Sequence, residues 1–385
     1  MIKLLTYNQI DPQQWQALVD SSPYATWFQT LEAYQFYAAV GGELIPFAFG
    51  VEEYEGDEAM RRSSDQAKDT LKGVIVGYVT KERNALKQCF TRRAIIIGGP
   101  LLAEDISETA LAELINAVAQ CKVESVKCKG TENSKADTNA STPYTLHPTP
   151  TESSTPYTLH HTPIYIESRN FHDYSKWKSI FEENGFAYQP HLNFHVNTTT
   201  TEIAQGNIGK HRWKYIRLSM RDGAKIVQQP TIEQVRAFYT ILQDLYRTKV
   251  RTPLWSWDFF ERLYHTEHAR YILVELDSQI VGGTACVCLP GKAVYEWYAC
   301  GLDNCRNDIR PLSVAIWGEM QYAAENDYPL FDFMGAGSPD QPYGVRDFKA
   351  EFGGELVEYG RFLCIRKPLL YWIGKMGVKW LKRRK

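Results

Sequence analysis

The sequence predicts an α+β protein built from two units of similar plan, and three observations lead to this class. First, its 385 residues exceed one typical core, since chains of this length commonly divide into about two domains. Second, 44% hydrophobic and 23% charged residues are typical of a globular protein. Third, amphipathic helix patterns alternate twice along the chain with runs of apolar strand residues.

The first unit is expected over residues 1–190. Its helices are predicted in the stretch that follows Asp11 and Pro12, a cap and a first-turn proline, and in TLEAYQFYAAVGG and TALAELINAVAQC. Strands are predicted in LIPFAFGVEE, GVIVGYVT and RAIIIGGPLL, and a hairpin loop in the polar span at 56–69. A tract at about 129–163, rich in Thr, Ser and Pro, contains STPYTLH twice, which predicts an exposed, disordered loop.

The second unit is expected over residues 191–367. The stretch YQPHLNFHVNT is predicted to be one strand leading into it, and GKHRWKYIRLSMRDG a basic helix. Two or three antiparallel strands with a DSQ turn follow, then a helix that begins with a proline and the strand LFDFMG. Residues 368–385 form a basic amphipathic tail, which predicts either an interfacial helix at the inner membrane surface or a helix docked on its own domain.

Charge and composition exclude several classes of protein. The formal net charge of −2 argues against a generally basic nucleic-acid binder. No window has the roughly 18 to 20 apolar residues of a spanning helix, and the first residues lack the apolar core of a secretory signal, so a cytoplasmic protein is expected. The eight cysteines form no C-x-x-C pair and are interpreted as free buried thiols. No metal or cofactor is predicted.

Residues 331–362 hold six glycines, several phenylalanines and an arginine–lysine pair, which indicates a binding site. The strand pair, helix, short strand and glycine loop of this half are similar to the GNAT acyltransferase fold. Within it, YEWYACG, FDFMGAG and YGVRDFKAEFGGELVEYGRF resemble the Fem family of peptidoglycan-bridge aminoacyltransferases, which carry two tandem GNAT-like domains. GKHRWKYIRLSMRDGAKI and IIIGGPLL resemble other parts of that family, so the likeness spans most of the chain.

The resemblance implies transfer of an amino acid from aminoacyl-tRNA to an amine of a peptidoglycan precursor, which is often lipid-linked. The long helical arm of several Fem proteins is absent here, because only a short helix and a turn separate Arg217 from Thr231. Two alternatives remain: an N-acyltransferase that uses another acyl donor on an envelope polysaccharide or lipid amine, and a non-catalytic scaffold of envelope assembly.

The family's DFK motif places the catalytic candidates. Lys349 is expected to polarise the carbonyl and stabilise the oxyanion, with Phe348 shaping the site; the alternative is a solvated lysine on a helix. Asp332 is expected to face opposite to the phenylalanines that flank it and to orient other groups, since a carboxylate of ordinary pKa is a poor base for an ammonium.

Substrate-binding candidates lie around the same motif. Arg346 and Lys349 share a helical face and are suited to phosphate or carboxylate, unless Arg346 pairs with a nearby aspartate. Gly335 and Gly337 permit close approach of a substrate or simply form a turn, and Tyr343 begins the motif. On the preceding strand, Tyr295 and Trp297 are expected on one face and Tyr298 on the other; the predicted tRNA or pyrophosphate cations are Lys210, Arg212 and Arg217.

The expected donor follows from what GNAT enzymes use for acetyl-CoA, a glycine-containing loop that opens the helix after the fourth strand. Here that position reads GLDNCRNDIRPLSVAIW, with no glycine after Gly301 and with Pro311 near the helix start. Aminoacyl-tRNA is therefore the expected donor.

Overall fold

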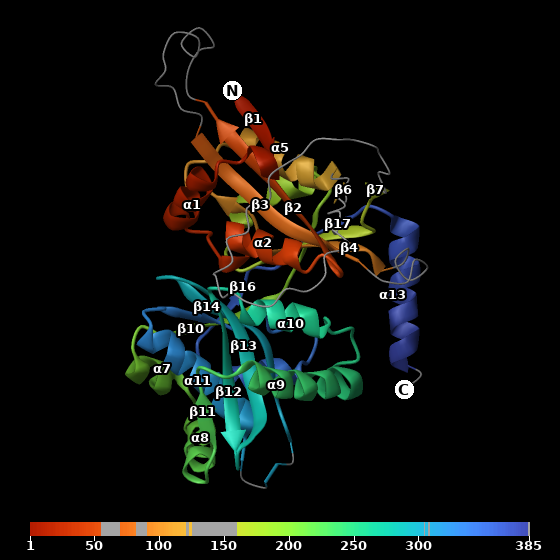
Figure 1. The fold of residues 1–385 in the computed structure, drawn as a ribbon. Helices are drawn as coiled ribbons and strands as arrows, with labels where there is room; N and C mark the ends of the chain where they lie inside the picture. Colours follow the sequence, from red (N-terminus) through yellow and green to blue (C-terminus); the bar gives the residue numbers. More distant parts are fainter. Residues whose placement is uncertain are drawn as a thin grey trace, which may run out of the picture.

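The computed structural model describes residues 1–54, 70–81, 91–120, 123–124, 160–303, 305–306 and 309–383. The predicted hairpin loop at 56–69 and most of the Thr/Ser/Pro-rich tract lie outside these residues. The described chain forms two sheet-and-helix units, one above the other in the ribbon view (Figure 1). Among the described residues, one further pair of short strands lies outside the two large sheets: β6 (Val123–Glu124) and β7 (His160–His161).

The first sheet has the strand order β1-β2-β3-β4-β8-β17-β9, with β5 paired to β3. Apolar residues of one face pack under α1 and α2, and those of the other face pack under α5 and α6. The strands are β1 (Ile2–Thr6), β2 (Leu44–Glu53), β3 (Thr70–Thr80), β4 (Arg93–Gly98), β5 (Leu101–Leu102), β8 (Tyr165–Asn170), β9 (Ala187–Gln189) and β17 (Arg361–Ile365). The helices are α1 (Pro12–Ser21), α2 (Leu31–Ala39), α5 (Glu108–Gln120), α6 (Lys178–Glu183) and the short 3-10 turns η1 (Tyr7–Gln9), η2 (Trp27–Gln29) and η3 (Ser175–Trp177).

The predicted helix starts of the first unit are confirmed by their caps. The Asp11 side chain accepts a hydrogen bond from Gln13 N, and Pro12 occupies the first turn of α1. Thr30 caps α2 in the same way by accepting from Ala33 N. Local sequence therefore determines where these helices begin.

The second sheet has the order β11-β12-β13-β14-β15-β10-β16. Its strands are β10 (Leu192–Asn197), β11 (Lys225–Val227), β12 (Ala269–Leu276), β13 (Gln279–Leu289), β14 (Ala293–Gly301), β15 (Leu330–Asp332) and β16 (Glu355–Glu358). Its helices are α7 (Thr201–Asn207), α8 (Lys210–Arg221), α9 (Ile232–Leu245), the π-helical turn η4 (Tyr246–Val250), α10 (Trp257–Tyr264), α11 (Pro311–Glu325) and α12 (Gly344–Ala350), and α13 (Pro368–Arg383) follows β17. The predicted helix from Pro311 and the predicted antiparallel strands are confirmed.

The two sheets exchange strands, which the sequence did not predict. The expected single strand YQPHLNFHVNT is wrong: β9 belongs to the first sheet and β10 to the second, separated at Pro190, which has no N–H to continue a ladder. In return β17 pairs with β8 and β9, so residues 361–365 lie in the first sheet and not, as expected, with the second unit. Two chain crossings therefore bind the units to each other.

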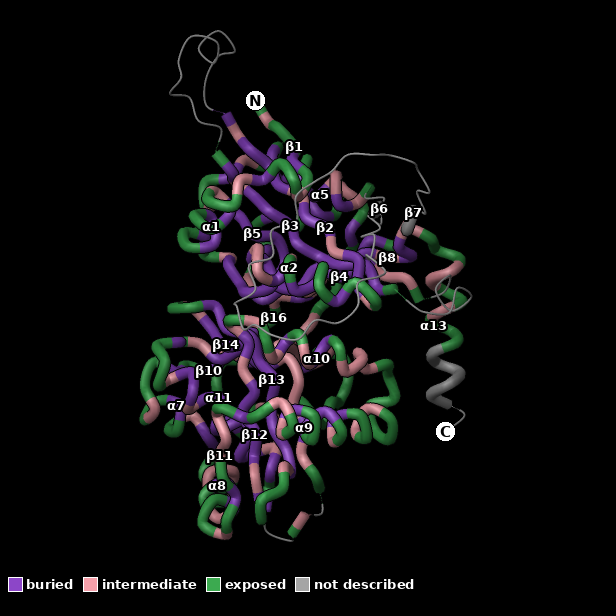
Figure 2. The backbone as a smooth tube through the Cα atoms, viewed as in Figure 1, coloured by how far each residue is buried: buried purple, intermediate pink, exposed green. Residues whose placement is uncertain are grey.

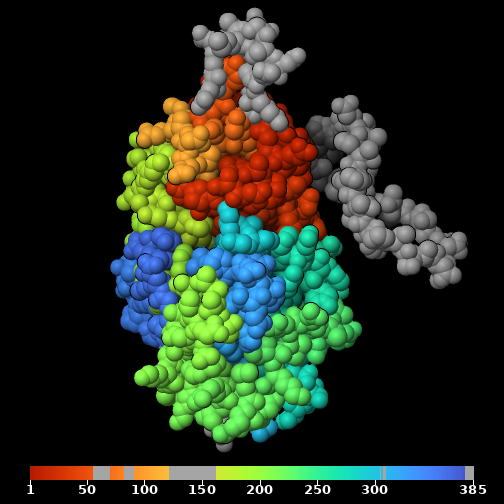
Figure 3. Space-filling model, turned by 90° about the vertical axis from the view of Figure 1, so that its left-hand side faces the viewer, coloured from red at the N-terminus to blue at the C-terminus, as the bar shows by residue number. Residues whose placement is uncertain are grey.

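An aromatic core joins the two units. Phe28 of the first unit lies 5.1 Å from Trp297 and 5.7 Å from Tyr295 of β14, measured between ring centroids. Phe171 stacks on Tyr295 at 5.7 Å. The space-filling view shows the surface of the first unit, red to orange, resting directly on the green and blue surface of the second (Figure 3). One hydrophobic cluster therefore contains residues of both units and is continuous between them.

The described helices include none with the length and apolar character needed to cross a membrane. Helix α13 lies beside the body of the molecule, at the right of the view, and its tube shows exposed residues along much of its described length (Figure 2).

Candidate active site

The parallel pair β14–β15 opens after three residues. Ala293–Tyr295 pairs with Leu330–Asp332, and beyond this point β14 continues beside β13 alone. Residues 333–337 turn away and follow β10, where Ala336 N donates to Leu192 O at 2.7 Å. A gap between two diverging main chains is therefore built into the second sheet.

A β-bulge on β14 lies at the same point. Cys286 of β13 pairs with Glu296 and Ala285 pairs with Tyr298, which leaves Trp297 without a partner in the ladder. A bulge redirects the side chains that follow it and is common next to active sites. Here it places Tyr298 on the same side of the sheet as Trp297, whereas Glu296 faces the other side.

Lys349, on α12, spans the opening. Its Nζ donates to Phe333 O at 2.7 Å and to Gly335 O at 2.9 Å, and lies 3.6 Å from Glu296 Oε1 on β14. The side chain is 13% exposed, so Lys349 is not a solvated surface lysine. An ammonium has three N–H groups and 3.6 Å exceeds a hydrogen bond. Among the described residues, Glu296 is therefore the ion-pair partner of the third N–H group, at a distance longer than an ordinary hydrogen bond.

Asp332 ends β15 and is almost fully buried, facing away from the phenylalanines on either side as predicted. One carboxylate oxygen accepts from Asn193 Nδ2 at 2.7 Å and from Met334 N at 2.5 Å, and the other lies 3.1 Å from His195 Nε2. Burial disfavours the charged ring of His195, but the hydrogen bond and the charge of Asp332 together raise its pKa. These contacts hold Asp332 rigidly and suit an orienting group.

Two buried glutamates lie behind Lys349. Burial raises the pKa of Glu296 to about 7, because the Lys349 ammonium offsets only part of the cost of a buried charge. Burial, together with the negative charge of Glu296, raises the pKa of Glu319 on α11 well above its ordinary value. Within the described residues, Oε2 of Glu296 has no hydrogen-bond partner, and contacts from Thr284 and Cys286 offset only part of the rise in the pKa of Glu319. This pair can therefore hold a proton at neutral pH.

The glycine loop is fixed from the same helix. Arg346 donates to Ser338 O at 2.9 Å and to Gln341 O at 2.6 Å, so it holds the loop rather than pairing with an aspartate as the alternative reading required. Gly337 has a φ of 79°, and a Cβ there would lie 2.8 Å from the Tyr343 ring, so Tyr343 packs on the glycine. The Tyr343 side chain is otherwise exposed. Arg346 and Lys349 therefore both hold main-chain carbonyl groups of residues 333–341.

Gly335 has a φ of 133°, which few other residues adopt, and a Cβ there would lie 3.3 Å from His191 Nε2. At Gly353 the main chain passes so close to Asn207 that a Cβ would lie 2.2 Å from its carbonyl oxygen, so a side chain does not fit there. The glycine content of this segment thus reflects tight packing as well as the loop beside Lys349.

The predicted cations of α8 divide into two kinds. Arg212 is committed to protein contacts: its guanidinium lies 4.6 Å over the Phe348 ring, pairs with Glu351 at 3.0 Å and donates to Ser313 Oγ at 2.8 Å. It therefore buttresses Phe348 beside the site. Lys210 and Arg217 are exposed and remain accessible to a polyanion.

Of the three aromatic residues of β14, Tyr295 and Trp297 share one face as predicted, and Tyr298 does not lie on the opposite face. Tyr295 and Trp297 are packed against the first unit, and Tyr298 lies on the same side, stacked on Trp297 at 5.9 Å and 5.0 Å from Phe260. The expected alternation is wrong because the bulge at Trp297 interrupts it. These rings form the interface core, and Glu296 is the β14 side chain that faces Lys349.

A polar network continues from the glycine loop into the first sheet. Arg361 of β17 donates to His191 Nε2 at 2.8 Å and to Glu167 at 2.7 Å, while Arg169 of β8 donates to the other oxygen of Glu167 at 3.1 Å. Burial, followed by the charge of Arg361, lowers the pKa of His191 to about 4, so its ring is neutral at pH 7. Two guanidinium groups sharing one carboxylate leave one net positive charge here.

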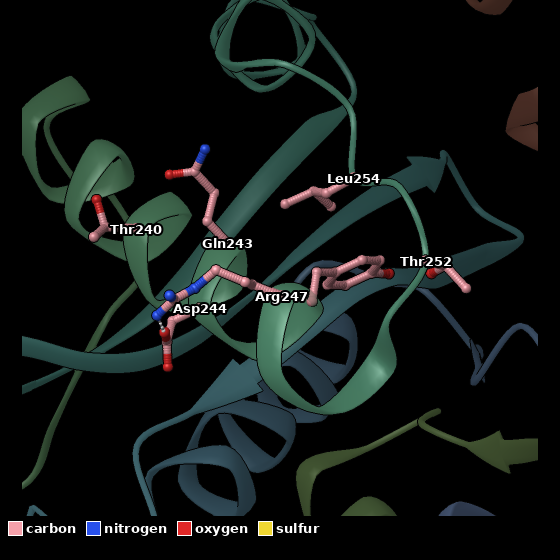
Figure 4. Close-up of a pocket in the computed structure, with 7 residues that line it drawn as sticks. Thr240, Gln243, Asp244, Arg247, Thr252 and Leu254 are labelled. Atoms are coloured by element: carbon pink, nitrogen blue, oxygen red, sulfur yellow. Dashed lines mark hydrogen bonds and ion pairs between the residues drawn. The ribbon is translucent and has the colours of Figure 1, made fainter. Parts of the chain in front are cut away.

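A separate hollow of about 520 Å³ lies at the end of α9 (Figure 4). In the close-up, Arg247 reaches Asp244 on one side of the hollow, at 2.5 Å, and Leu254 and Thr252 come from the loop before α10. It is lined by Thr240, Gln243, Asp244, Tyr246, Arg247, Thr252 and Leu254, and none of the predicted site residues contributes. No group of three or more metal-ligating side chains occurs among the residues the structure describes.

Sequence reasoning missed the polar network of Glu167, Arg169, His191 and Arg361. It also missed four polar residues closer to Lys349 and Asp332: Glu296, Glu319, Asn193 and His195. A signal existed for two of them, because Glu296 stands within the apolar stretch AVYEWYAC and Glu319 within a helix buried on nearly all sides. Asn193 and His195 carried no signal, since their role depends on β10 lying beside β15.

Comparison with known proteins agrees with this architecture. Residues 210–349 match the family model of the acetyltransferase (GNAT) domain. The fold is similar to that of FemX, with 12% identity over 96% of this chain and 99% of that chain and a TM-score of 0.62. It is also similar to the C-terminal domain of a putative lysylphosphatidylglycerol synthetase from Agrobacterium fabrum, with 10% identity over 95% of each chain and a TM-score of 0.51. No curated protein matches the chain.

These findings confirm the predicted fold class, and the GNAT domain match supports acyl transfer as the class of reaction. The match ends at Lys349, so it includes the opening between β14 and β15. The chain has two tandem GNAT-like units in a fold similar to that of FemX, and its residues 210–349 match the family model of the acetyltransferase (GNAT) domain.

Proposed function

We propose that this protein is an aminoacyltransferase that moves an amino acid from aminoacyl-tRNA to an amine of a peptidoglycan precursor. One observation carries the proposal: Lys349 bridges the opening between β14 and the 333–337 loop, where a ligand can share its third N–H group with the ion-pair partner Glu296. The donor and the acceptor meet at that opening, and the amide product forms there.

Lys349 supplies electrostatic stabilisation. When the amine attacks the ester carbonyl, the carbonyl oxygen becomes an oxyanion, and the remaining Lys349 N–H donates to it. Because the other two N–H groups are fixed by Phe333 O and Gly335 O, the ammonium is preorganised and need not reorient during the reaction. Phe348, held by Arg212, limits access of water from one side.

The attacking amine must lose a proton and the departing ribose oxygen must gain one. Glu296 lies next to Lys349, and its pKa of about 7 allows it to accept and return a proton at neutral pH. Asp332 is occupied by three hydrogen-bonding partners and orients the loop instead. We therefore assign the proton-holding role to Glu296.

The start of α11 favours tRNA over acetyl-CoA as the donor. Pro311 has no N–H, and Arg310 N already donates to Ser219 Oγ at 2.9 Å, so two amides near this helix start are not available to a pyrophosphate. By contrast, Lys210, Lys214 and Arg217 recur at helical spacing on α8 and are exposed. This cationic face suits the phosphates of a tRNA.

The acceptor side is proposed to be the network below the glycine loop. The side chains of Arg169 and Arg361 are 33% and 25% exposed, and they share a single carboxylate, Glu167. The surplus positive charge suits a carboxylate or phosphate of the precursor. Because His191 joins Arg361 to the Gly335 loop, an acceptor bound there points toward Lys349.

A second candidate is aminoacyl or acyl transfer to a lipid. It is supported by the fold of the putative lysylphosphatidylglycerol synthetase domain and by the same arrangement around Lys349. The two candidates share the donor side and differ only in the acceptor.

The test uses the purified full chain with tRNA carrying a labelled amino acid, supplied in turn with a soluble peptidoglycan precursor, a lipid-linked precursor and phosphatidylglycerol. We expect an amide-linked product on a precursor, identified by mass spectrometry. Product on phosphatidylglycerol alone supports the second candidate. Product formed only when acetyl-CoA replaces the charged tRNA overturns the proposed donor, and no product with any donor, although envelope enzymes are bound, favours a scaffold.

A further inference from the structure

Among its described side chains, at residues 368–377, helix α13 contacts the body of the protein through one face. The chain enters it through Arg366 N and Lys367 N, which donate to Ile164 O at 2.8 and 3.0 Å, and the Tyr371 ring lies edge-on to Tyr165 at 5.5 Å. Leu370 and Gly374, on the same side as Tyr371, are partly covered. The helix is therefore docked by this face. The docked helix that was expected as an alternative leaves four large apolar residues of α13 uncovered.

The opposite face is apolar and uncovered. It carries residues at the i, i+3, i+4 and i+7 positions of one helical face, exposed by 74%, 56%, 41% and 63%: Leu369, Trp372, Ile373 and Met376. Of the fourteen exposed large hydrophobic residues in the described chain, these four lie within eight positions. Scattered apolar residues are normal on a surface, but a contiguous patch marks an interaction site.

The C-terminal segment that carries this patch has charges of one sign in its sequence. The last twenty residues of the sequence contain eight lysines and arginines and no acidic residue. Lys375 lies 5.2 Å over the Trp372 ring and 5.8 Å from the Tyr371 ring, so its ammonium flanks the apolar face. A tryptophan in an apolar face bordered by cations is the pattern of a helix at the surface of an anionic lipid bilayer.

We propose that α13 binds the headgroup region of an anionic lipid surface, with Leu369, Trp372, Ile373 and Met376 inserted and the cations facing the lipid phosphates. A second copy of the chain fits less well, because a two-fold interface would bring the same eight cations of each copy together without any acidic partner. The inference does not depend on which acyl group the enzyme transfers, because the patch and the Lys349 site are different regions.

The experiment compares full-length protein with the variant Leu369→Ser/Trp372→Ser/Met376→Ser in co-sedimentation with phosphatidylcholine vesicles that contain or lack phosphatidylglycerol. We expect binding of the wild type to the anionic vesicles, weaker at high salt, and at least about a tenfold loss in the variant. Lys375→Glu, which keeps the apolar face, is expected to weaken binding about fivefold.

The matched control is Leu4→Ser/Ile203→Ser/Met220→Ser, which removes three residues of 40 to 43% exposure from other surfaces and should leave binding unchanged. Thermal unfolding of each variant checks that the fold is retained. Equal vesicle binding by wild type and the α13 variant, or none by either, overturns the proposal. So does a dimer of the wild type, detected by analytical ultracentrifugation, that the α13 variant abolishes without any vesicle binding.

Discussion

The two units contain the same parallel strand pair, closed in one and open in the other. In the first sheet, β4 and β8 pair over six residues, from Arg93 and Tyr165 to Gly98 and Asn170. In the second sheet, the corresponding pair β14–β15 lasts three residues and then separates. The next strand in each sheet, β17 or β10, arrives from elsewhere in the chain. One topology therefore provides either a continuous strand pair or a pair whose strands diverge, depending on where pairing ends.

The side chains at the two pairs differ accordingly. At the closed pair, Glu167 is satisfied by Arg169 on its own strand and by Arg361 on the next strand, which ties the sheet together. At the open pair, Glu296 has an ammonium at 3.6 Å and one oxygen without a hydrogen-bond partner among the described residues. Ion pairs therefore stabilise the strand pair β4–β8. At the strand pair β14–β15, one carboxylate oxygen of Glu296 lacks a hydrogen-bond partner among the described residues.

The largest expected effect comes from removing the cation at the open pair. Lys349→Met should lower kcat by about 100-fold or more, since one lost oxyanion donor costs roughly 3 to 4 kcal/mol. Steady-state assays measure it. Lys72→Met is the matched control, because Lys72 is 14% exposed and paired with Asp105 on the first unit. A change within about twofold for Lys349→Met would exclude it from the mechanism.

At the closed pair the expected effect is on stability. Glu167→Gln should lower the free energy of unfolding by roughly 3 kcal/mol, because two partly buried arginines lose their carboxylate. Urea unfolding measures the change, and Glu182→Gln, in an exposed pair with Lys178, should cost less than about 0.5 kcal/mol. Equal losses in the two variants would show that the network does not tie the strands.

The same carboxylate predicts the response to acid. Although burial opposes ionisation, the charges of Arg169 and Arg361 lower the pKa of Glu167 to about 2. Its contribution to stability is therefore present above the unfolded pKa near 4.5 and is lost as the pH falls toward 2. The Gln variant should lack this part of the acid dependence.

Glu296 predicts the opposite pH dependence. Its folded pKa of about 7 exceeds the unfolded value of 4.5, so its contribution is fully present below pH 4.5 and is lost as the pH rises to about 7. Relative to wild type, Glu296→Gln should therefore gain stability across this interval, by up to roughly 3 kcal/mol, and no more above it. Unfolding titrations at a series of pH values test this, and a constant difference between the two proteins would contradict the assigned burial.

The smallest expected effect concerns acceptor binding. Arg169→Gln should raise KM for the precursor about tenfold with little change in kcat, because a contact present in both ground and transition states is lost. Arg262→Gln, at an exposed pair with Asp258, should leave KM unchanged. If Arg169→Gln changes kcat and not KM, the acceptor does not bind at this network.

Local features of the fold were predictable from the sequence. The helix starts at Pro12 and Pro311 follow from caps and first-turn prolines, and the turn at Asp277 and Ser278 follows from residues that tolerate the positive φ values of 49° and 62° seen there. These features depend on neighbours in sequence. The exchanged strand β17 does not, because it pairs with β8 almost two hundred positions earlier in the chain.

The candidate site was predictable in part for the same reason. The motif around Lys349 identified the cation, but its partners Phe333 O, Gly335 O and Glu296 required the geometry of the opening. The face of Tyr298 was mispredicted because a single bulge at Trp297 inverts the alternation, and nothing in the local sequence marks that bulge.

The exchanged strand also sets the order in which the chain can mature. Strand β17 lies between β8 and β9 in the first sheet, yet it is synthesised after every strand of the second. Until β17 is synthesised, β8 and β9 of the first sheet therefore each have one unpaired edge. Each of these edges can pair with other exposed strands. A stop after residue 360 would remove only a short C-terminal portion but would leave the N-terminal sheet permanently incomplete. In this protein, loss of residues 361–385 therefore damages the sheet of the N-terminal unit.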